Sequence, residues 1–257
     1  MPRKSSSKGK PSSLYVIEGK ETQIMHYLFH VKVATADQIN RDVFKSSDLS
    51  YCFKKIRKLE KLEYLQRKYI KLGMRAKSTF HLTKKAYHEF ITHENKNDLK
   101  KRIFSSSIEH DIQLVDIRYS FKRCKTVLDY NAENFLHSGA GYIDSLGVED
   151  ILRINSDALI QLKGSTQDYF FTIEYEANLK FHSRVKQKIT QYYKTKRLAG
   201  VFYILKNEQI MKSLIAIEKS NFDSHEPKIF YALLDNVKNH DGNMHFIDRN
   251  GEKLTIK

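Results

Sequence analysis

The sequence predicts an α/β protein, of the α+β kind, in which a winged helix-turn-helix precedes a domain of order α-β-β-β-α-β. Its 257 residues suffice for two ordinary domains, each with a core of its own. Hydrophobic residues make up 40% and charged residues 29%, which is typical of a soluble globular protein. Helical apolar periodicity dominates the first part, whereas short apolar runs alternate with helices in the second. Together these features predict a small helical module followed by a mixed sheet with helices.

The net charge of +15 lies almost entirely in the first part of the chain. Residues 1–102 hold 24 Lys and Arg against 10 Asp and Glu, a net of +14, whereas residues 103–257 hold 21 against 20, a net of +1. This asymmetry predicts a polyanion-binding module joined to a nearly neutral domain. Residues 1–19 predict a basic flexible arm, either a solvated tail or an arm that grips phosphates.

Residues 20–102 predict a winged-helix domain that begins with three helices. An apolar stripe over residues 24–31 marks the first helix, Thr35 can cap the second, and residues 46–48 supply a turn and a cap for the third. The third helix carries apolar residues on one side and four lysines outside them: Lys54, Lys55, Lys58 and Lys61. In a helix-turn-helix the later helix lies in the major groove of DNA, with such lysines close to phosphates.

A β-hairpin, the wing, is predicted next. Residues 64–70 and 78–82 have the pattern of short strands, and the connector between them carries three basic residues, Lys71, Arg75 and Lys77. Residues 84–91 predict a closing helix. Lysines on one helix are often no more than its solvated face, but here basic residues recur in the third helix, the wing and the arm, which face one side of a winged helix. We therefore predict that this domain binds double-stranded DNA.

Residues 103–257 predict the α-β-β-β-α-β domain. A helix over 105–124 has two apolar stripes and should be largely buried. The further predicted elements are strands at 127–133, 152–162 and 169–177, a long helix at 179–197, a strand at 199–205, a helix at 207–219 and a strand at 228–234. Short apolar strands between helices predict one mixed sheet with helices on its faces.

Three acidic residues interrupt the predicted strands. Asp157 lies in the otherwise apolar strand at 152–162, and Glu174 and Glu176, two residues apart, project from one face of the next strand. Burying a carboxylate is unfavourable unless it is paired or binds a metal ion. Acids on neighbouring strands can hold Mg²⁺, which can polarise a phosphate and activate water for phosphodiester hydrolysis. The next helix adds Lys180 and Lys188, which either bind the scissile phosphate or form a solvated face.

His110 lies early in the helix at 105–124, where it can take part in proton transfer, bind the metal, or be a core residue with satisfied hydrogen bonds. Cys52 and Cys124 are far apart and form no CxxC motif, which argues against a disulfide framework or a zinc finger. The pair Tyr192-Tyr193 lacks the His-rich motif that a relaxase would need. No P-loop, GxGxxG or GxSxG motif occurs, so no nucleotide cofactor is expected.

The order of elements, with an Asp on one strand and a Glu-x-Glu pair on the next, resembles the PD-(D/E)xK restriction-endonuclease-like superfamily. More narrowly, the chain resembles the Replication-relaxation family of plasmids and other mobile elements over roughly residues 20–205. The matching pieces are the winged helix in front, His110-Asp111, Asp157-Ala158, Glu174-Tyr175-Glu176, and Lys188 four residues before Tyr192. The resemblance implies a nuclease-like fold for residues 103–257.

The same resemblance implies that Asp157 and Glu174 are metal-binding acids for Mg²⁺ or Mn²⁺. Position 176 is where the superfamily usually has Lys, and this chain has Glu there; Ser156 stands where Pro is frequent. Some members take their Lys from the next helix, for which Lys188 or Lys180 would serve. The departure at Glu176 keeps a non-catalytic DNA-binding scaffold as an alternative.

The sequence thus favours a DNA-binding protein of a mobile element that cuts or nicks DNA with Mg²⁺ or Mn²⁺. Two alternatives stay open. One is a non-catalytic replication-initiation or transcription regulator whose second domain serves dimerisation, as a homodimer, or partner binding; the other is an RNA-processing nuclease. No apolar run approaches the roughly 20 residues that span a bilayer, and no secretory signal is evident, so we expect a cytoplasmic protein without membrane partners.

Overall fold

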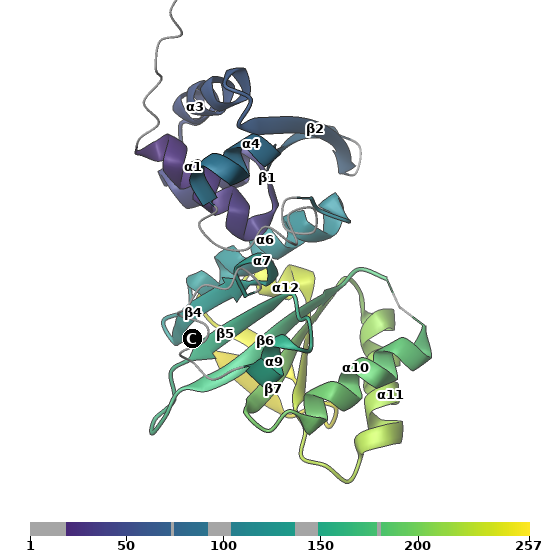
Figure 1. Ribbon diagram of the computed structural model, residues 1–257. Helices are drawn as coiled ribbons and strands as arrows, with labels where there is room; N and C mark the ends of the chain where they lie inside the picture. The colour runs from purple at the N-terminus through teal and green to yellow at the C-terminus, as the bar shows by residue number, and fades with distance from the viewer. Residues whose placement is uncertain (1–18, 73–74, 92–103, 137–148, 179–180) are drawn as a thin grey trace, which may run out of the picture.

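The computed structural model describes residues 19–72, 75–91, 104–136, 149–178 and 181–257. They form a small three-stranded sheet with helices, stacked on a seven-stranded sheet that is flanked by helices (Figure 1). Within these residues, no helix has both the length and the apolar character needed to cross a membrane. The predicted arm, residues 1–19, lies outside the described part of the chain except for its last residue.

The first part has the predicted three helices and hairpin. Its elements are α1 (Lys20–Val31), β1 (Val33–Thr35), α2 (Ala36–Ile39), the π-helical turn η1 (Asn40–Phe44), α3 (Leu49–Lys61), β2 (Leu65–Leu72), β3 (Arg75–Leu82), α4 (Lys84–Ala86) and the π-helical turn η2 (Tyr87–Ile91). The sheet order is β1-β3-β2, and both pairings are antiparallel. A winged helix is therefore present in the order that the sequence predicts.

Local signals account for the boundaries of these helices. The Thr35 side chain accepts a hydrogen bond from the backbone N–H of Gln38, whose side chain in turn accepts one from the Thr35 N–H, so the two form a capping box. Asp48 caps α3 by accepting from the Ser50 N–H. The hairpin strands are longer than predicted and pair up to Leu72 and Arg75; residues 73–74 between them lie outside the described part of the chain.

The second part is built on the sheet of order β10-β9-β8-β7-β6-β5-β4. Its elements are α6 (Ile108–Lys122), β4 (Val127–Ala132), α7 (Glu133–Leu136), α9 (Glu149–Leu152), β5 (Ala158–Leu162), β6 (Tyr169–Glu176), α10 (His182–Lys194), β7 (Leu198–Leu205), α11 (Glu208–Phe222), β8 (Ile229–Leu233), α12 (Leu234–Lys238), β9 (Met244–Ile247) and β10 (Lys253–Ile256). Strands β6, β7 and β8 are parallel, and the other pairs are antiparallel. The mixed sheet of the predicted class is confirmed.

Helices cover both faces of this sheet and divide its core in two (Figure 1). Helices α10 and α11 pack on one face through buried residues such as Ile189 and Leu214. Helices α6 and α12 pack on the other face, where Phe121 and Val237 are buried. Both faces of the sheet are apolar, and helices cover both, as expected for a sheet with parallel central strands.

One predicted strand is wrong in part. Residues 152–157 do not extend β5: Leu152 ends the short helix α9, and the strand begins at Ala158. Asn155 adopts a left-handed backbone conformation (φ 54°), which interrupts any extended run at this point. Asp157 therefore precedes the strand instead of lying within it. Strands β1, β9 and β10 were not predicted, because runs of three or four residues carry little periodic signal.

Helix α6 joins the two parts of the molecule. Its residue Val115 is buried in the core of the winged helix, whereas Ile117 and Phe121 are buried against the large sheet. The Gln38 side chain donates hydrogen bonds to the carbonyl of Ile112 and to the carboxylate of Asp116, both at 3.0 Å. The winged helix is thus bonded directly to the helix that starts the second domain.

Candidate functional site

The strand pairing brings the predicted acids to one edge of the large sheet. Strand β5 is antiparallel to β6, so the residue before β5 lies beside the end of β6. The backbone N–H of Asp157 donates to the carbonyl of Ile173, and its Oδ2 accepts from the N–H of Tyr175 at 2.8 Å. Asp157 is thereby fixed next to the strand segment that carries Glu174 and Glu176.

Glu174 is enclosed by α10. Its side chain is 2% exposed, and one oxygen accepts a hydrogen bond from Nζ of Lys188 at 2.6 Å. The other oxygen accepts from the hydroxyl of Tyr192, one turn further along the same helix. Burial raises the pKa of Glu174 to about 7, although the charge of Lys188 acts to lower it. Lys188, which was predicted from its spacing in the sequence, is thus one hydrogen-bond partner of Glu174. Tyr192, which was not among the predicted site residues, is the other.

His110 reaches the same edge from the first turn of α6. Its Nδ1 lies 3.3 Å from the carboxylate of Asp111, and its Nε2 lies 3.2 Å from the carbonyl oxygen of Tyr175 and 3.5 Å from Oδ2 of Asp157. Burial by itself would lower the pKa of His110, but its contacts with Asp111 and Asp157 outweigh burial and raise the pKa to about 10. Protonated His110 forms an ion pair with Asp157 and holds that carboxylate in place.

His110 and Lys188 hold the carboxyl group of Asp157 in the ionised state. Burial would raise the pKa of its carboxyl, but the contact with His110 and the charge of Lys188 lower the pKa below its ordinary value. Glu176 is buried at 8% exposure and lines a small pocket together with Arg184 and Lys188. Lys180, the other predicted basic residue, lies outside the described residues.

The donor set fits a divalent cation in its chemistry. Asp157 and Glu174 are carboxylates at one sheet edge, and among the described hydrogen bonds none uses Oδ1 of Asp157, so that oxygen is available to a hard cation. Both oxygens of Glu174 are bonded within the protein, to Lys188 and Tyr192. In the part of the chain that the structure describes, no three His, Cys, Asp or Glu residues are arranged to hold a metal ion. A site here would rest on two carboxylates, completed by backbone oxygen or water.

The predicted DNA face of α3 divides into two sets of cations. Lys54 and Lys61 are exposed, and so is Arg57, which lies between them on the same helix face but was not singled out from the sequence. Lys55 and Lys58 instead bond to Oε1 of Glu21 in α1, each at 2.9 Å. The prediction that all four lysines lie on the outer face is therefore met by Lys54 and Lys61 only: Glu21 is buried and draws the other two inward.

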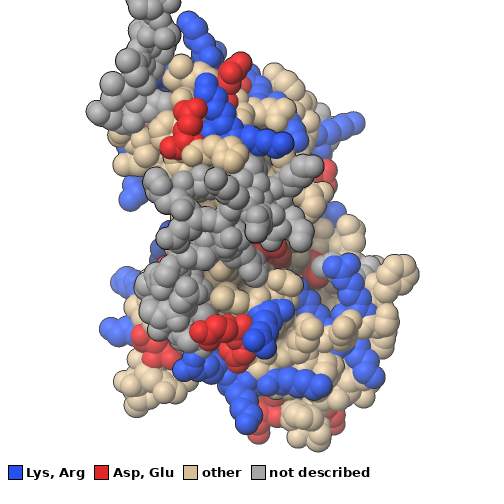
Figure 2. All heavy atoms as spheres, in the orientation of Figure 1, with Lys and Arg blue, Asp and Glu red and all other residues tan. Residues whose placement is uncertain are grey.

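The wing adds exposed cations beside α3. Lys71 and Lys77 are exposed on the hairpin, and the side chain of Arg75 lies outside the described residues. Tyr69, 70% exposed, stands on the same hairpin. Figure 2 shows Lys and Arg side chains spread over the upper, winged-helix part of the molecule.

Comparison with known proteins identifies the family. A family model described as Replication-relaxation matches residues 25–203, more than half of the chain, and the chain therefore belongs to the Replication-relaxation family. This confirms the resemblance predicted from the sequence and makes the chain a DNA-related protein of mobile elements. No curated protein matches the chain.

Solved structures give only distant likenesses. The restriction endonuclease FokI bound to DNA is 11% identical, with a TM-score of 0.23, over 85% of this chain and 44% of that chain. FokI in a second structure is 9% identical, with a TM-score of 0.23, over 85% of this chain and 43% of that chain. The chain thus spans less than half the length of these proteins, and at this TM-score neither fold nor activity follows from the likeness.

Proposed function

We propose that this protein docks on duplex DNA through the winged helix and hydrolyses a phosphodiester bond at the acidic centre of the second domain. The observation that carries the proposal is the position of Asp157 and Glu174 at one sheet edge, with the Lys188 ammonium 2.6 Å from Glu174. Acids and a cation together suit a phosphate group and the metal that accompanies it. The exposed cations of α3 and the wing supply affinity for the DNA backbone.

Asp157 and Glu174 are the residues that would hold Mg²⁺ or Mn²⁺. When bound, such a metal polarises the phosphate and activates water. His110 positions Asp157 through the ion pair between its Nε2 and Oδ2 of Asp157, and this contact keeps the Asp157 carboxylate ionised. Lys188 stands where its ammonium can offset the negative charge that develops on the phosphate. The Glu at position 176 does not supply that charge, so Lys188 takes the place of the lysine usual in this superfamily.

A second function is supported by the bonding of Glu174. Both of its oxygens already have partners in Lys188 and Tyr192, and His110 neutralises Asp157. These contacts balance the buried acids without a metal, as a non-catalytic regulator of replication or transcription would require. In that case the winged helix alone would act on DNA.

Incubation of supercoiled and linear DNA with Mg²⁺ or Mn²⁺ separates the two functions. We expect the wild type to nick or cut, and Asp157→Asn and Glu174→Gln to lose that activity while binding DNA as before. Glu208→Gln, which removes an exposed carboxylate on α11, is the matched control and should remain active. Calorimetric titration with Mn²⁺ gives a readout independent of cleavage.

Nuclease function is ruled out if the wild type and both acid variants leave DNA equally intact while Mn²⁺ binds none of them. The regulator then stands, provided that duplex binding persists. Failure of the wild type to bind duplex DNA would overturn both functions.

A further inference from the structure

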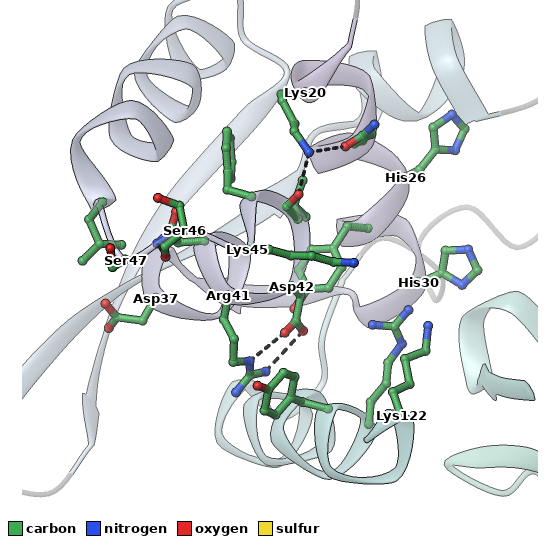
Figure 3. A pocket seen from close by; sticks show the side chains of 18 of the residues that line it. Lys20, His26, His30, Asp37, Arg41, Asp42, Lys45, Ser46, Ser47 and Lys122 are labelled. Atoms are coloured by element: carbon green, nitrogen blue, oxygen red, sulfur yellow. Dashed lines mark hydrogen bonds and ion pairs between the residues drawn. The ribbon is translucent and has the colours of Figure 1, made fainter. Parts of the chain in front are cut away.

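A large cavity lies at the junction of the two domains, away from the acidic centre. The winged helix contributes residues from α1, α2, η1 and the start of α3, and the second domain contributes the C-terminal half of α6. Figure 3 shows Lys45 from the turn before α3 and Lys122 from α6 entering this space from different sides. Neither domain could form this cavity alone.

The lining of the cavity is strongly basic. Its Lys and Arg residues outnumber its acids by six to two; they are Lys20, Arg41, Lys45, Arg118, Lys122 and Arg123. The acids are Asp37, which is exposed, and Asp42, which is already bonded to Arg41 and to the hydroxyl of Tyr27. The cavity therefore holds positive charge that its own acids do not balance.

Within the described part of the chain, Arg41 is the only one of these six cations with an acidic partner. Among the described residues, no carboxylate lies within ion-pair distance of Lys45, Arg118 or Lys122, whereas Arg41 pairs with both Asp42 and Asp116. Nε of Arg118 is buried and has no hydrogen-bond partner in the described part of the chain. Partial desolvation and the charge of Arg118 both lower the pKa of Lys122, as expected where like charges are crowded together. Such crowding is unfavourable unless an anion joins it.

We propose that this cavity is a phosphate site, separate from the outer face of α3, and that it takes a phosphate of the DNA backbone. The inference rests on the proposed DNA binding. Ser46 and Ser47, directly before α3, form part of the cavity wall, so the site is continuous with the end of the helix that faces DNA. On its other side, Arg118 also lines a smaller cavity that includes Asp157. A strand held here would run from the winged helix towards the acidic centre.

The experiment compares the wild type with two variants. The first is the double change Arg118→Gln/Lys122→Gln, which also removes the packing of Arg118 on the ring of Tyr27. The second is Lys45→Gln, which changes an exposed side chain and leaves that packing intact. Lys125→Gln removes an exposed lysine just beyond α6 that does not line the cavity and is the matched control. Duplex binding is measured at several salt concentrations, and binding of pyrophosphate is measured by calorimetry. Thermal unfolding checks that each variant is folded.

We expect the double variant to lower the slope of log Kd against log salt by about 1, the value for one phosphate contact, and Lys45→Gln to lower it in the same direction, with Lys125→Gln unchanged. An unchanged slope in folded cavity variants overturns the proposal while leaving the proposed function intact. If the slope is unchanged but pyrophosphate binding is lost, the ligand is a free phosphate compound and the backbone assignment is wrong. If the wild type binds no duplex, the proposed function fails, and the loss or retention of pyrophosphate binding decides whether the cavity is a phosphate site.

Discussion

The two sets of cations on α3 should respond differently to mutation. Replacement of the exposed set, Lys54, Arg57 and Lys61, by Ala removes charges that reach solvent. Replacement of Lys55 and Lys58 by Ala removes charges that are bonded to Glu21. We expect the first change to weaken DNA binding and the second to weaken the fold.

The magnitudes follow from the geometry. Each phosphate contact contributes about 0.9 to the slope of log Kd against log salt, so loss of three contacts lowers that slope by about 2.7. The side chain of Glu21 is 3% exposed, and a buried carboxylate left without its partners destabilises a protein by about 3 kcal/mol. Burial alone would raise the pKa of Glu21, but Lys55 and Lys58 lower it; the pairing therefore stabilises the fold above the ordinary carboxyl range and is lost as pH falls.

Both quantities can be measured on the same preparations. Fluorescence anisotropy with a labelled duplex over a series of KCl concentrations gives the slope, and urea unfolding at neutral pH gives the free energy of unfolding. The result that refutes this reasoning is an equal fall in slope for the Lys55/Lys58 variant, because those lysines would then bind phosphate and not Glu21. Full stability of that variant would refute it as well.

Two further predictions concern buried titratable groups. His81 is 1% exposed, and burial lowers its pKa to about 4. Between about pH 6.5 and pH 4 this histidine is therefore protonated in the unfolded chain but neutral in the folded chain. Stability should therefore fall by about 3 kcal/mol between pH 6.5 and 4, and urea unfolding of His81→Leu should lack this loss. Lys188→Met should lower the free energy of unfolding by about 3–5 kcal/mol at pH 8 and by less at pH 6. The wild-type Glu174 (pKa about 7) is ionised and paired with Lys188 at pH 8 but largely protonated at pH 6, and loss of the Lys188 charge raises the pKa of Glu174 further. The double variant Lys188→Met/Glu174→Gln should recover most of that loss; a loss that does not depend on pH would mean that Lys188 acts through packing alone.

The local parts of this structure could be predicted from the sequence. Thr35 and Asp48 begin helices because their side chains accept hydrogen bonds from N–H groups two or three residues ahead, which is a short-range chemical property. The strand before Asp157 was misplaced because Leu152 and Ile154 look like strand residues. Asn155, a residue type that tolerates the left-handed conformation, was the available signal against it.

The contacts that define the sites are long-range and could not be predicted in the same way. Spacing put Lys55 and Lys58 on the outer side of α3, but the carboxylate of Glu21 comes from α1 and reverses their role. His110 reaches Asp157 only because α6 packs against the end of β6. Tyr192 was open to prediction as a partner of Glu174, since it lies four residues from Lys188 and shares its helix face.

Helix α6 places the proposed sites in a fixed relation to one another. Its first turn carries His110 against Asp157, its middle is bonded to the winged helix through Asp116, and its last turns supply Arg118 and Lys122 to the basic cavity. At 1.5 Å per residue, His110 and Lys122 lie about 18 Å apart along the helix axis, which equals roughly five base-pair rises of 3.4 Å along the axis of a DNA duplex. A duplex whose axis runs parallel to α6 and whose phosphate occupies the cavity would therefore have the acidic centre about five base pairs away. Because one rigid helix sets that separation, DNA binding by the winged helix and chemistry at Asp157 would be linked by distance, without any movement of the domains.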